Sequence, residues 1–329
     1  MLPALLLSLV VASSFAEATV DRPVFGQDTA KPAAPPQTIV QKVRAAIGGN
    51  DFVKAEKLVL DDMAANGTTP IAIEAFSWLG RGAVAAKNYD AAMTYAARTY
   101  EIVDEQLKTR KLDDEARLPI ALGAAIEVTA LATAGQGRRS EAVLYLRREL
   151  DTYKDTSIVE RLNKNVNLLS LEGSPAFPVD SPKWIGAAPP AMAALKGKPV
   201  ILYLWAHWCP DCKAQGPVLA AILEKYKSTG LTLVAPTKFY GYVAKRQPAG
   251  PDEELTYLTG VRDSDYPWMK NIPVPISEQI FVQYGVSTTP TLVLIDRAGI
   301  VSKYHPGQLT VEQLEPLIQK IIAPLGSAR

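Results

Sequence analysis

Apolar residues recur every three or four positions from residue 37 to residue 171, which is the spacing of helices that bury one face. Phe52, for example, is followed at helical spacing by Ala55 and Val59. Short breaks rich in Gly and Asn separate the periodic stretches, and no alternation typical of strands occurs between them. The pattern predicts an all-helical domain. Its main helices are expected at Ile71–Ala86, Tyr89–Leu107, Leu118–Ala134, Glu141–Tyr153 and Ile158–Leu169.

A weak repeat runs through this helical region. Residues 50–55 resemble residues 88–92, and residues 137–142 form a looser copy. With Trp78-Leu79-Gly80 ahead of the second copy, the pattern resembles tetratricopeptide repeats, although the spacing is irregular and the proline that ends a repeat is missing. The resemblance implies an array of helical hairpins that presents a concave surface to a partner protein. A scaffold or a dimerisation module is the alternative.

The pattern changes after a proline-rich stretch at residues 172–198. Pro199–Trp205 is a continuous apolar run rich in strand formers, which suits a central strand buried on both faces. A helical pattern then continues to about Tyr226. The order predicts a C-terminal α/β domain, residues 172–329, with a mixed sheet flanked by helices. Its other elements are expected to be a strand at Leu231–Ala235, a hairpin of Thr291–Ile295 with Ile300–Tyr304, and a helix at Val311–Ile322.

The first residues have the pattern of an export signal. Leu2–Val11 is an apolar run too short to span a bilayer comfortably, and small residues around Ala16 suit cleavage, although no Lys or Arg precedes the run. Residues 1–18 are therefore expected to be a signal peptide, followed by a linker rich in Pro and Ala at residues 19–36. The expected location is the periplasm, and an uncleaved signal would anchor the protein to the membrane.

Length and charge narrow the classes of function. The chain of 329 residues is long enough for two domains that each bury a core. Its formal net charge is +1, and it contains no basic run and no Gly-rich phosphate loop. Binding of nucleic acid or nucleotides is therefore not expected.

The two cysteines of the chain, Cys209 and Cys212, lie in one Cys-Pro-Asp-Cys motif. A disulfide between them closes almost no loop, so it removes little entropy from the unfolded chain and would stabilise the fold very little. Redox chemistry explains the pair better than a structural role does. No metal site is expected.

Two motifs resemble thioredoxin over about residues 175–325. The first is Trp208-Cys209-Pro210-Asp211-Cys212-Lys213 with Pro217, and the second is Tyr284–Leu292, which contains Thr289-Pro290-Thr291. Together with the apparent signal peptide, Leu204–Cys209 is most similar to the exported TlpA/ResA-like thiol reductases. The resemblance implies a thioredoxin-like fold and reduction of disulfides in exported client proteins. It also implies a membrane electron donor and no cofactor besides the redox-active pair.

The two cysteines are expected to have different roles. Cys209 would begin a helix, where free backbone N–H groups and the helix dipole favour its thiolate, so it is the expected nucleophile. Cys212, one turn later, would resolve the mixed disulfide. The resemblance further implies that the Thr289–Pro290 bond is cis, that the Thr289 backbone pairs with the substrate, and that Trp208 covers one side of the sulfur pair.

The sequence departs from the family pattern near the motif. Tyr203 stands where thioredoxins have a buried acid, so the group that assists Cys212 is not identified, and Gln215 stands where the TlpA/ResA-like proteins often have Glu. Asp211 and Pro210 should both disfavour the Cys209 thiolate, the first by its charge and the second by lacking an N–H. His207 is expected to be an exposed neighbour that would favour the thiolate when protonated.

An insertion is expected at about residues 236–276, with a helix at Glu253–Val261. Its aromatic residues would either pack on the domain's own sheet, which is the favoured interpretation, or form a flap that contacts substrate. These residues are Phe239, Tyr240, Tyr242, Tyr257, Tyr266 and Trp268.

The same sequence features are compatible with other functions. A dithiol oxidant or isomerase of the DsbA type would use the same motif. Copper delivery would use the two cysteines with His207 or His305, and the helical domain alone would suit an adaptor protein. Haem attachment is excluded because Lys213, not His, follows the second cysteine. Peroxiredoxin chemistry is excluded because the arrangement of Thr or Ser with Pro ahead of a lone cysteine is absent.

Overall fold

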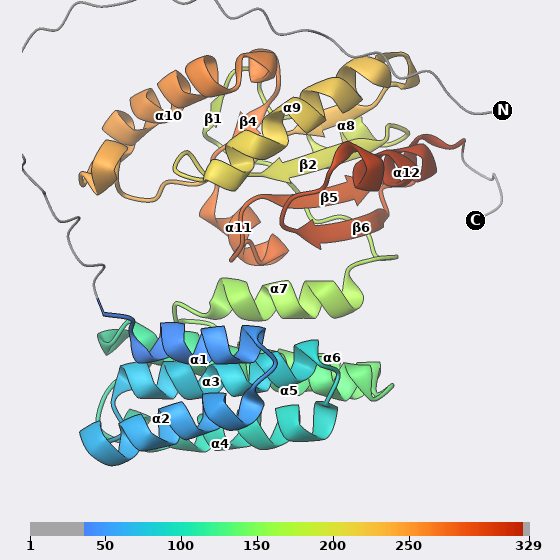
Figure 1. The fold of residues 1–329 in the computed structure, drawn as a ribbon. Coiled ribbons are helices and arrows are strands. Elements are labelled where there is room, and N and C mark those ends of the chain that lie inside the picture. Colours follow the sequence, from blue (N-terminus) through green and yellow to red (C-terminus); the bar gives the residue numbers. More distant parts are fainter. Residues whose placement is uncertain (1–35, 325–329) are drawn as a thin grey trace, which may run out of the picture. The chain divides into compact units, whose positions relative to one another are not determined.

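The computed structural model describes residues 36–324, and residues 38–324 belong to one compact unit (Figure 1). The expected signal peptide and nearly all of the linker lie outside the described residues. The described part has the predicted architecture, since helices α1–α7 come first and an α/β domain with a mixed sheet follows.

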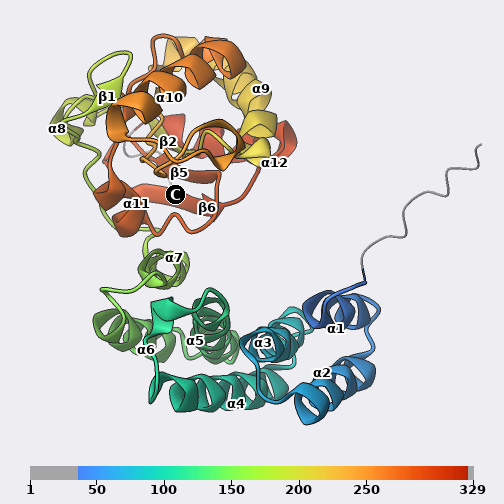
Figure 2. The ribbon, with the colours of Figure 1, turned by 90° about the vertical axis from the view of Figure 1, so that its left-hand side faces the viewer.

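The helical region is built from consecutive helices that pack as hairpins. Each helix contacts the next, and the odd-numbered helices also contact one another, α1 with α3, α3 with α5 and α5 with α7, as the end-on view of Figure 2 shows. The fold class is as predicted, whereas membership in the tetratricopeptide family stays a prediction. The helices are α1 Ile39–Gly48, α2 Phe52–Asn66, α3 Pro70–Ala85, α4 Tyr89–Leu107, α5 Arg117–Gly135, α6 Arg139–Thr152 and α7 Val159–Ser170.

Local sequence signals explain where these helices begin. Thr38, Asp51, Thr69 and Asn88 each precede a helix and accept a hydrogen bond from a backbone N–H of its first turn. Helix α5 is long and apolar enough to cross a membrane by composition, yet most of its residues are buried among the other helices. Its apolar character is therefore explained by its place in the core of the helical region.

The α/β domain is centred on a four-stranded sheet in the order β3-β2-β5-β6. Strand β2 runs parallel to β3 and antiparallel to β5, and β5 forms the predicted hairpin with β6. A separate two-stranded sheet pairs β1 with β4. The strands are β1 Trp184–Ile185, β2 Val200–Leu204, β3 Thr232–Val234, β4 Val274–Pro275, β5 Thr291–Ile295 and β6 Val301–Pro306, and the helices are α8 Met192–Leu195, α9 Pro210–Lys225, α10 Pro251–Asp265, α11 Glu278–Tyr284 and α12 Val311–Ile322.

Strand β2 is buried on both faces, as its apolar run predicts. Ile201 and Tyr203 point into one core, which they share with residues of α9, α10 and α12. Leu202 and Leu204 point into the other, which contains residues of α11. Because the strand is fixed from both sides, the loop that follows it has a defined position.

Helix α11, which the sequence pattern did not predict, joins the two regions. It ends at Gly285, whose φ of +62° is left-handed, and a Cβ there would overlap the backbone of α7 at Lys164. The Asn167 side chain of α7 also donates a hydrogen bond to the Gln283 carbonyl at 3.0 Å. Lys238, after β3, pairs with Glu160 of α7 at 2.5 Å. Helix α7 is therefore packed closely against the α/β domain.

Candidate active site

The end of β2 places the Cys-Pro-Asp-Cys motif at the start of α9. Cys209 is the N-cap of this helix, and Pro210 occupies its first turn, where a missing N–H is tolerated. The Cys209 sulfur accepts a hydrogen bond from the Cys212 backbone N–H at 3.1 Å. Both cysteines are free thiols, and only 2% of the Cys209 surface is exposed. The helix start thus provides the Cys209 sulfur with a backbone donor.

The second motif lies next to the first. The Thr289–Pro290 peptide bond is cis, and the Cys209 sulfur lies 3.4 Å from the Thr289 carbonyl oxygen, to which it donates a hydrogen bond when it is protonated. Strand β5 begins at the following residue, Thr291. Residues about eighty positions apart in the sequence are thereby brought together at one end of the sheet.

The surroundings make the two thiols chemically different. The Cys212 thiol contributes most to lowering the pKa of Cys209 to about 6, and hydrogen bonds from Thr289 and the Cys212 backbone assist it, whereas burial and the Asp211 carboxylate oppose it. Burial raises the pKa of Cys212 well above its usual range. At neutral pH the pair therefore contains one thiolate, at Cys209, and one thiol, at Cys212.

The pKa of Cys209 predicts how the reduced protein depends on pH. The rate of alkylation by iodoacetamide should be half-maximal near pH 6, compared with about pH 8.5 for an ordinary cysteine. Since the folded-state pKa is the lower one, the thiolate contributes stability that is fully present above about pH 8.5 and is lost as the pH falls through 6. Thermal unfolding of the reduced protein and of Cys209→Ser should diverge across this interval. An alkylation profile centred near pH 8.5 would contradict the assignment.

Aromatic side chains surround Cys212. Tyr203 is one of them, and it occupies the position at which thioredoxins have a buried acid. The Tyr203 side chain is fully buried, and its hydroxyl donates a hydrogen bond to the Cys212 carbonyl at 2.7 Å. Burial raises the pKa of Tyr203, so the hydroxyl stays neutral. Trp205 packs on Tyr266 with ring centroids 4.9 Å apart, and Trp268 lies 6.3 Å from the Tyr203 ring. This apolar surrounding is what keeps Cys212 protonated.

Gln215 has a structural role in the site. Its side-chain amide donates to the Leu309 carbonyl at 3.1 Å, and its oxygen accepts from the Leu309 N–H at 2.8 Å. The side chain is buried and fully paired, which ties α9 to the segment before α12. A neutral amide satisfies both backbone groups, whereas an ionised Glu would satisfy only the N–H.

Two motif residues are more exposed than the cysteines. Trp208 has 48% of its surface exposed and packs edge-on against Tyr240, with ring centroids 5.6 Å apart. Asp211 is exposed, and its carbonyl accepts a hydrogen bond from the Gln308 side chain at 2.7 Å. Covering of the sulfur pair by Trp208 stays a prediction.

The expectation that His207 is exposed was wrong. Only 3% of its surface is exposed, because rings of the insertion surround it with centroids 5.3–5.5 Å away. Burial lowers the pKa of His207, although Glu254 at 3.5 Å from its Nε2 partly offsets this. The imidazole is therefore neutral at neutral pH and does not favour the Cys209 thiolate by charge. The surrounding rings belong to Tyr240, Tyr242 and Tyr257.

Glu254 was not predicted as a residue of the site. The carboxylate of this buried residue accepts hydrogen bonds from the backbone N–H groups of Tyr240 at 2.6 Å and Gly241 at 2.8 Å. Glu254 lies 47 positions after His207, and only the folded insertion brings them together. His305 lies on β6, and among residues 36–324 no three His, Cys, Asp or Glu side chains are grouped so as to hold a metal ion.

The C-terminal part of the chain is similar to known proteins of one kind. Residues 190–322 match the model of the thioredoxin-like domain. The thiol-disulfide oxidoreductase ResA of Bacillus cereus is 32% identical over 129 residues, which are 39% of this chain and 65% of that relative. The thiol:disulfide interchange protein DsbE of Xylella fastidiosa is 28% identical over 131 residues, 40% of this chain and 58% of the relative. The chain thus spans less than two thirds of the length of these relatives.

Solved structures with partial similarity include two from other bacteria. A thiol:disulfide interchange protein of the thioredoxin family from Chlorobium tepidum is 21% identical with a TM-score of 0.34, covering 45% of this chain and 99% of its own. A thiol-disulfide isomerase from Corynebacterium glutamicum is 18% identical with a TM-score of 0.37, covering 46% and 97%. Residues 190–322 therefore match a thioredoxin-like domain, and over this part the chain is similar to the thiol-disulfide oxidoreductases ResA and DsbE.

Proposed function

We propose that this protein is a thiol–disulfide oxidoreductase that reduces disulfides of exported client proteins. The observation that carries the proposal is the asymmetry of the pair, in which Cys209 is a helix-capping sulfur with a pKa of about 6 beside Cys212, a buried thiol. A low-pKa sulfur paired with a protonated one is what sequential attack and resolution require.

The reaction proceeds in two exchanges. The Cys209 thiolate attacks one sulfur of the client disulfide, which forms a mixed disulfide and releases the other client sulfur as a thiolate. The Cys212 thiol then attacks the Cys209 sulfur and gives its proton to the departing client sulfur. Two electrons pass from the pair to the client, and the pair is left as a disulfide. A dithiol donor must reduce it again, and we infer that the donor is a membrane protein.

The direction of the reaction follows from the reduction potential of the pair. Thioredoxin has a nucleophile with a pKa of about 7 and a potential of about −270 mV. Each unit by which the pKa of the nucleophile is lowered stabilises the reduced form by at most about 1.4 kcal/mol, which corresponds to about 30 mV in a two-electron couple. The potential is therefore expected to lie closer to that of thioredoxin than to that of DsbA at about −120 mV.

Equilibrium titration against glutathione and dithiothreitol, with thiol trapping, tests this proposal. A value near or below about −250 mV supports a reductase. The lowered pKa of Cys209 also favours the second candidate, a dithiol oxidant, and a potential above about −150 mV would establish that function instead. A pair that forms no reversible disulfide would overturn both.

We infer that the protein acts in an oxidising compartment, as the N-terminal sequence pattern suggests, and that its substrates are proteins. The helical region, with its row of contacting odd-numbered helices, is the part available for a dedicated protein partner.

A further inference from the structure

A small hairpin beside the motif has an unusual turn. Residues 241–249 fold back on themselves, since Val243 donates to the Gln247 carbonyl at 2.8 Å and Gln247 to the Ala244 carbonyl at 3.1 Å. The two residues at the tip, Lys245 and Arg246, have φ angles of 55° and 60°. A two-residue turn with both φ values positive normally contains Asn and Gly, because other side chains are strained there. The tip therefore has two cationic residues in a conformation that neither favours.

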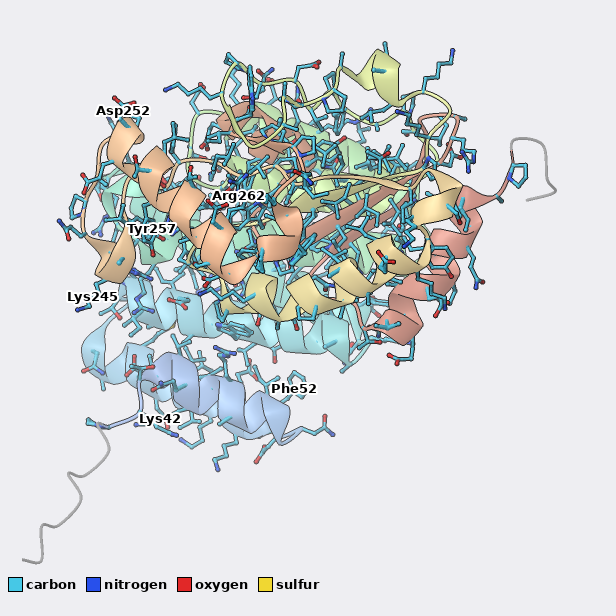
Figure 3. All side chains as sticks on the ribbon, turned by 90° about the horizontal axis from the view of Figure 1, so that it is seen from above. Lys42, Phe52, Lys245, Asp252, Tyr257 and Arg262 are labelled. Carbon is cyan, nitrogen blue, oxygen red and sulfur yellow. The ribbon has the colours of Figure 1, made fainter. Side chains whose placement is uncertain are left out.

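The hairpin forms one wall of a groove of about 390 Å³ that reaches the motif. Trp208, Pro210 and Lys213 line the side nearest Cys209, and Tyr242, Lys245 and Arg246 line the other. In Figure 3, Lys245 and Tyr257, another lining residue, lie at the same edge of the domain. We call this hollow the basic groove.

The charge of the basic groove is of one sign. Three of its lining residues are cationic and none is acidic. Lys213 is paired with Asp265 at 2.5 Å, whereas Lys245 and Arg246 are exposed and form no ion pair with any of the residues that the structure describes. Since the whole chain has a net charge of only +1, this is a local feature and not part of a general positive field.

The hairpin is held in place from its base. Glu254 accepts hydrogen bonds from the backbone of Tyr240 and Gly241, where the hairpin starts, and lies 3.5 Å from His207 in the loop before the motif. Tyr242 of the hairpin packs edge-on against the His207 ring. The cationic tip is thus fixed relative to the Cys209 sulfur and does not depend on a client for its position.

We propose that the basic groove binds an acidic segment next to the client disulfide and so selects the clients of this protein. The inference rests on the proposed function, because the groove adjoins the reacting sulfur. Charge complementarity identifies the occupant as a polypeptide rich in Asp and Glu, and the aromatic rings supply contact area for its backbone. Charges at the rim act mainly on the rate of association, so the effect should weaken with salt.

Two disulfide-containing peptides that differ only in their flanking residues, Glu in one and Lys in the other, test the proposal. The reduced protein should reduce the acidic peptide about tenfold faster at low salt, and 0.5 M NaCl should remove most of the difference. Lys245→Glu with Arg246→Glu should abolish the preference. Lys196→Glu with Lys198→Glu is the matched control, because both residues are exposed and precede the opposite end of β2, and the preference should persist there.

A second variant separates charge from folding. Lys245→Asn with Arg246→Gly gives the turn its preferred residues, so the melting temperature should rise while the preference for the acidic peptide falls. Equal rates for both peptides, with normal exchange against oxidised dithiothreitol, would overturn the groove assignment alone. Loss of exchange with every disulfide would overturn the proposed function. Binding of the acidic peptide to Cys209→Ser with Cys212→Ser, weakened about fivefold by the Glu pair, supports the groove independently of the redox chemistry.

Discussion

Replacing Cys209 with serine is expected to lower the rate of disulfide exchange by about a thousandfold or more, because a hydroxyl provides no comparable nucleophile near neutral pH. Replacing Cys212 should have a different result. The first exchange still occurs in Cys212→Ser, but nothing resolves the product, so a mixed disulfide with the client accumulates. The two variants therefore differ in the product that accumulates, a mixed disulfide only in Cys212→Ser, although both lose turnover.

Turnover of a peptide disulfide and mass spectrometry of the trapped protein measure these outcomes. Cys212→Ser is also expected to alter the pKa of Cys209, since the Cys212 thiol is the group that lowers it most, and alkylation near pH 6 should slow accordingly. Unchanged circular dichroism in both variants serves as the control for folding. Trapping at position 212 in Cys209→Ser would reverse the assigned roles.

Gly285→Ala is expected to destabilise the protein by about 2–5 kcal/mol, the largest effect we foresee for a single methyl group. Two penalties combine at this position. The residue must keep a left-handed φ of +62°, and the new methyl group would overlap the α7 backbone at Lys164 and Asn163. Neither backbone can yield without separating α7 from α11.

Gly230→Ala is the matched control, because this glycine is also left-handed, with φ +79°, but has nothing within 4 Å of its missing Cβ. It should cost only the backbone penalty of about 1–2 kcal/mol. Denaturant unfolding measures both variants. Equal destabilisation by the two substitutions would show that the close approach of α7 to Gly285 does not contribute.

The sequence predicted those features that local signals encode. Tyr89–Leu107 was predicted with the bounds that the structure shows, because Asn88 caps its start and apolar periodicity continues to its end. The helix Val311–Ile322 was also predicted with the bounds that the structure shows, because Thr310 forms a capping box at its start. The Cys-Pro-Asp-Cys motif could be recognised because its two cysteines are separated by two residues.

The features that were not predicted from the sequence depend on tertiary contacts or on elements too short to show a pattern. Helix α11 has only seven residues, too few for a periodic pattern to be recognised. The burial of His207 depends on rings 33–50 positions later, which no local pattern reveals. Most of the insertion aromatics, among them Tyr257, Tyr266 and Trp268, pack on the core of the domain as the favoured interpretation predicts, whereas contact of the insertion with substrate stays a prediction.

The burial of Cys212 one helical turn from Cys209 also bears on chemical damage. A peroxide that reaches the Cys209 thiolate would convert it to a sulfenic acid, which further oxidation turns irreversibly into a sulfinic acid. The neighbouring thiol, which is protonated and therefore much less reactive towards oxidants, can condense with the sulfenic acid, releasing water and forming the same disulfide that a client produces. Oxidative injury would then return the protein to a normal state of its own cycle.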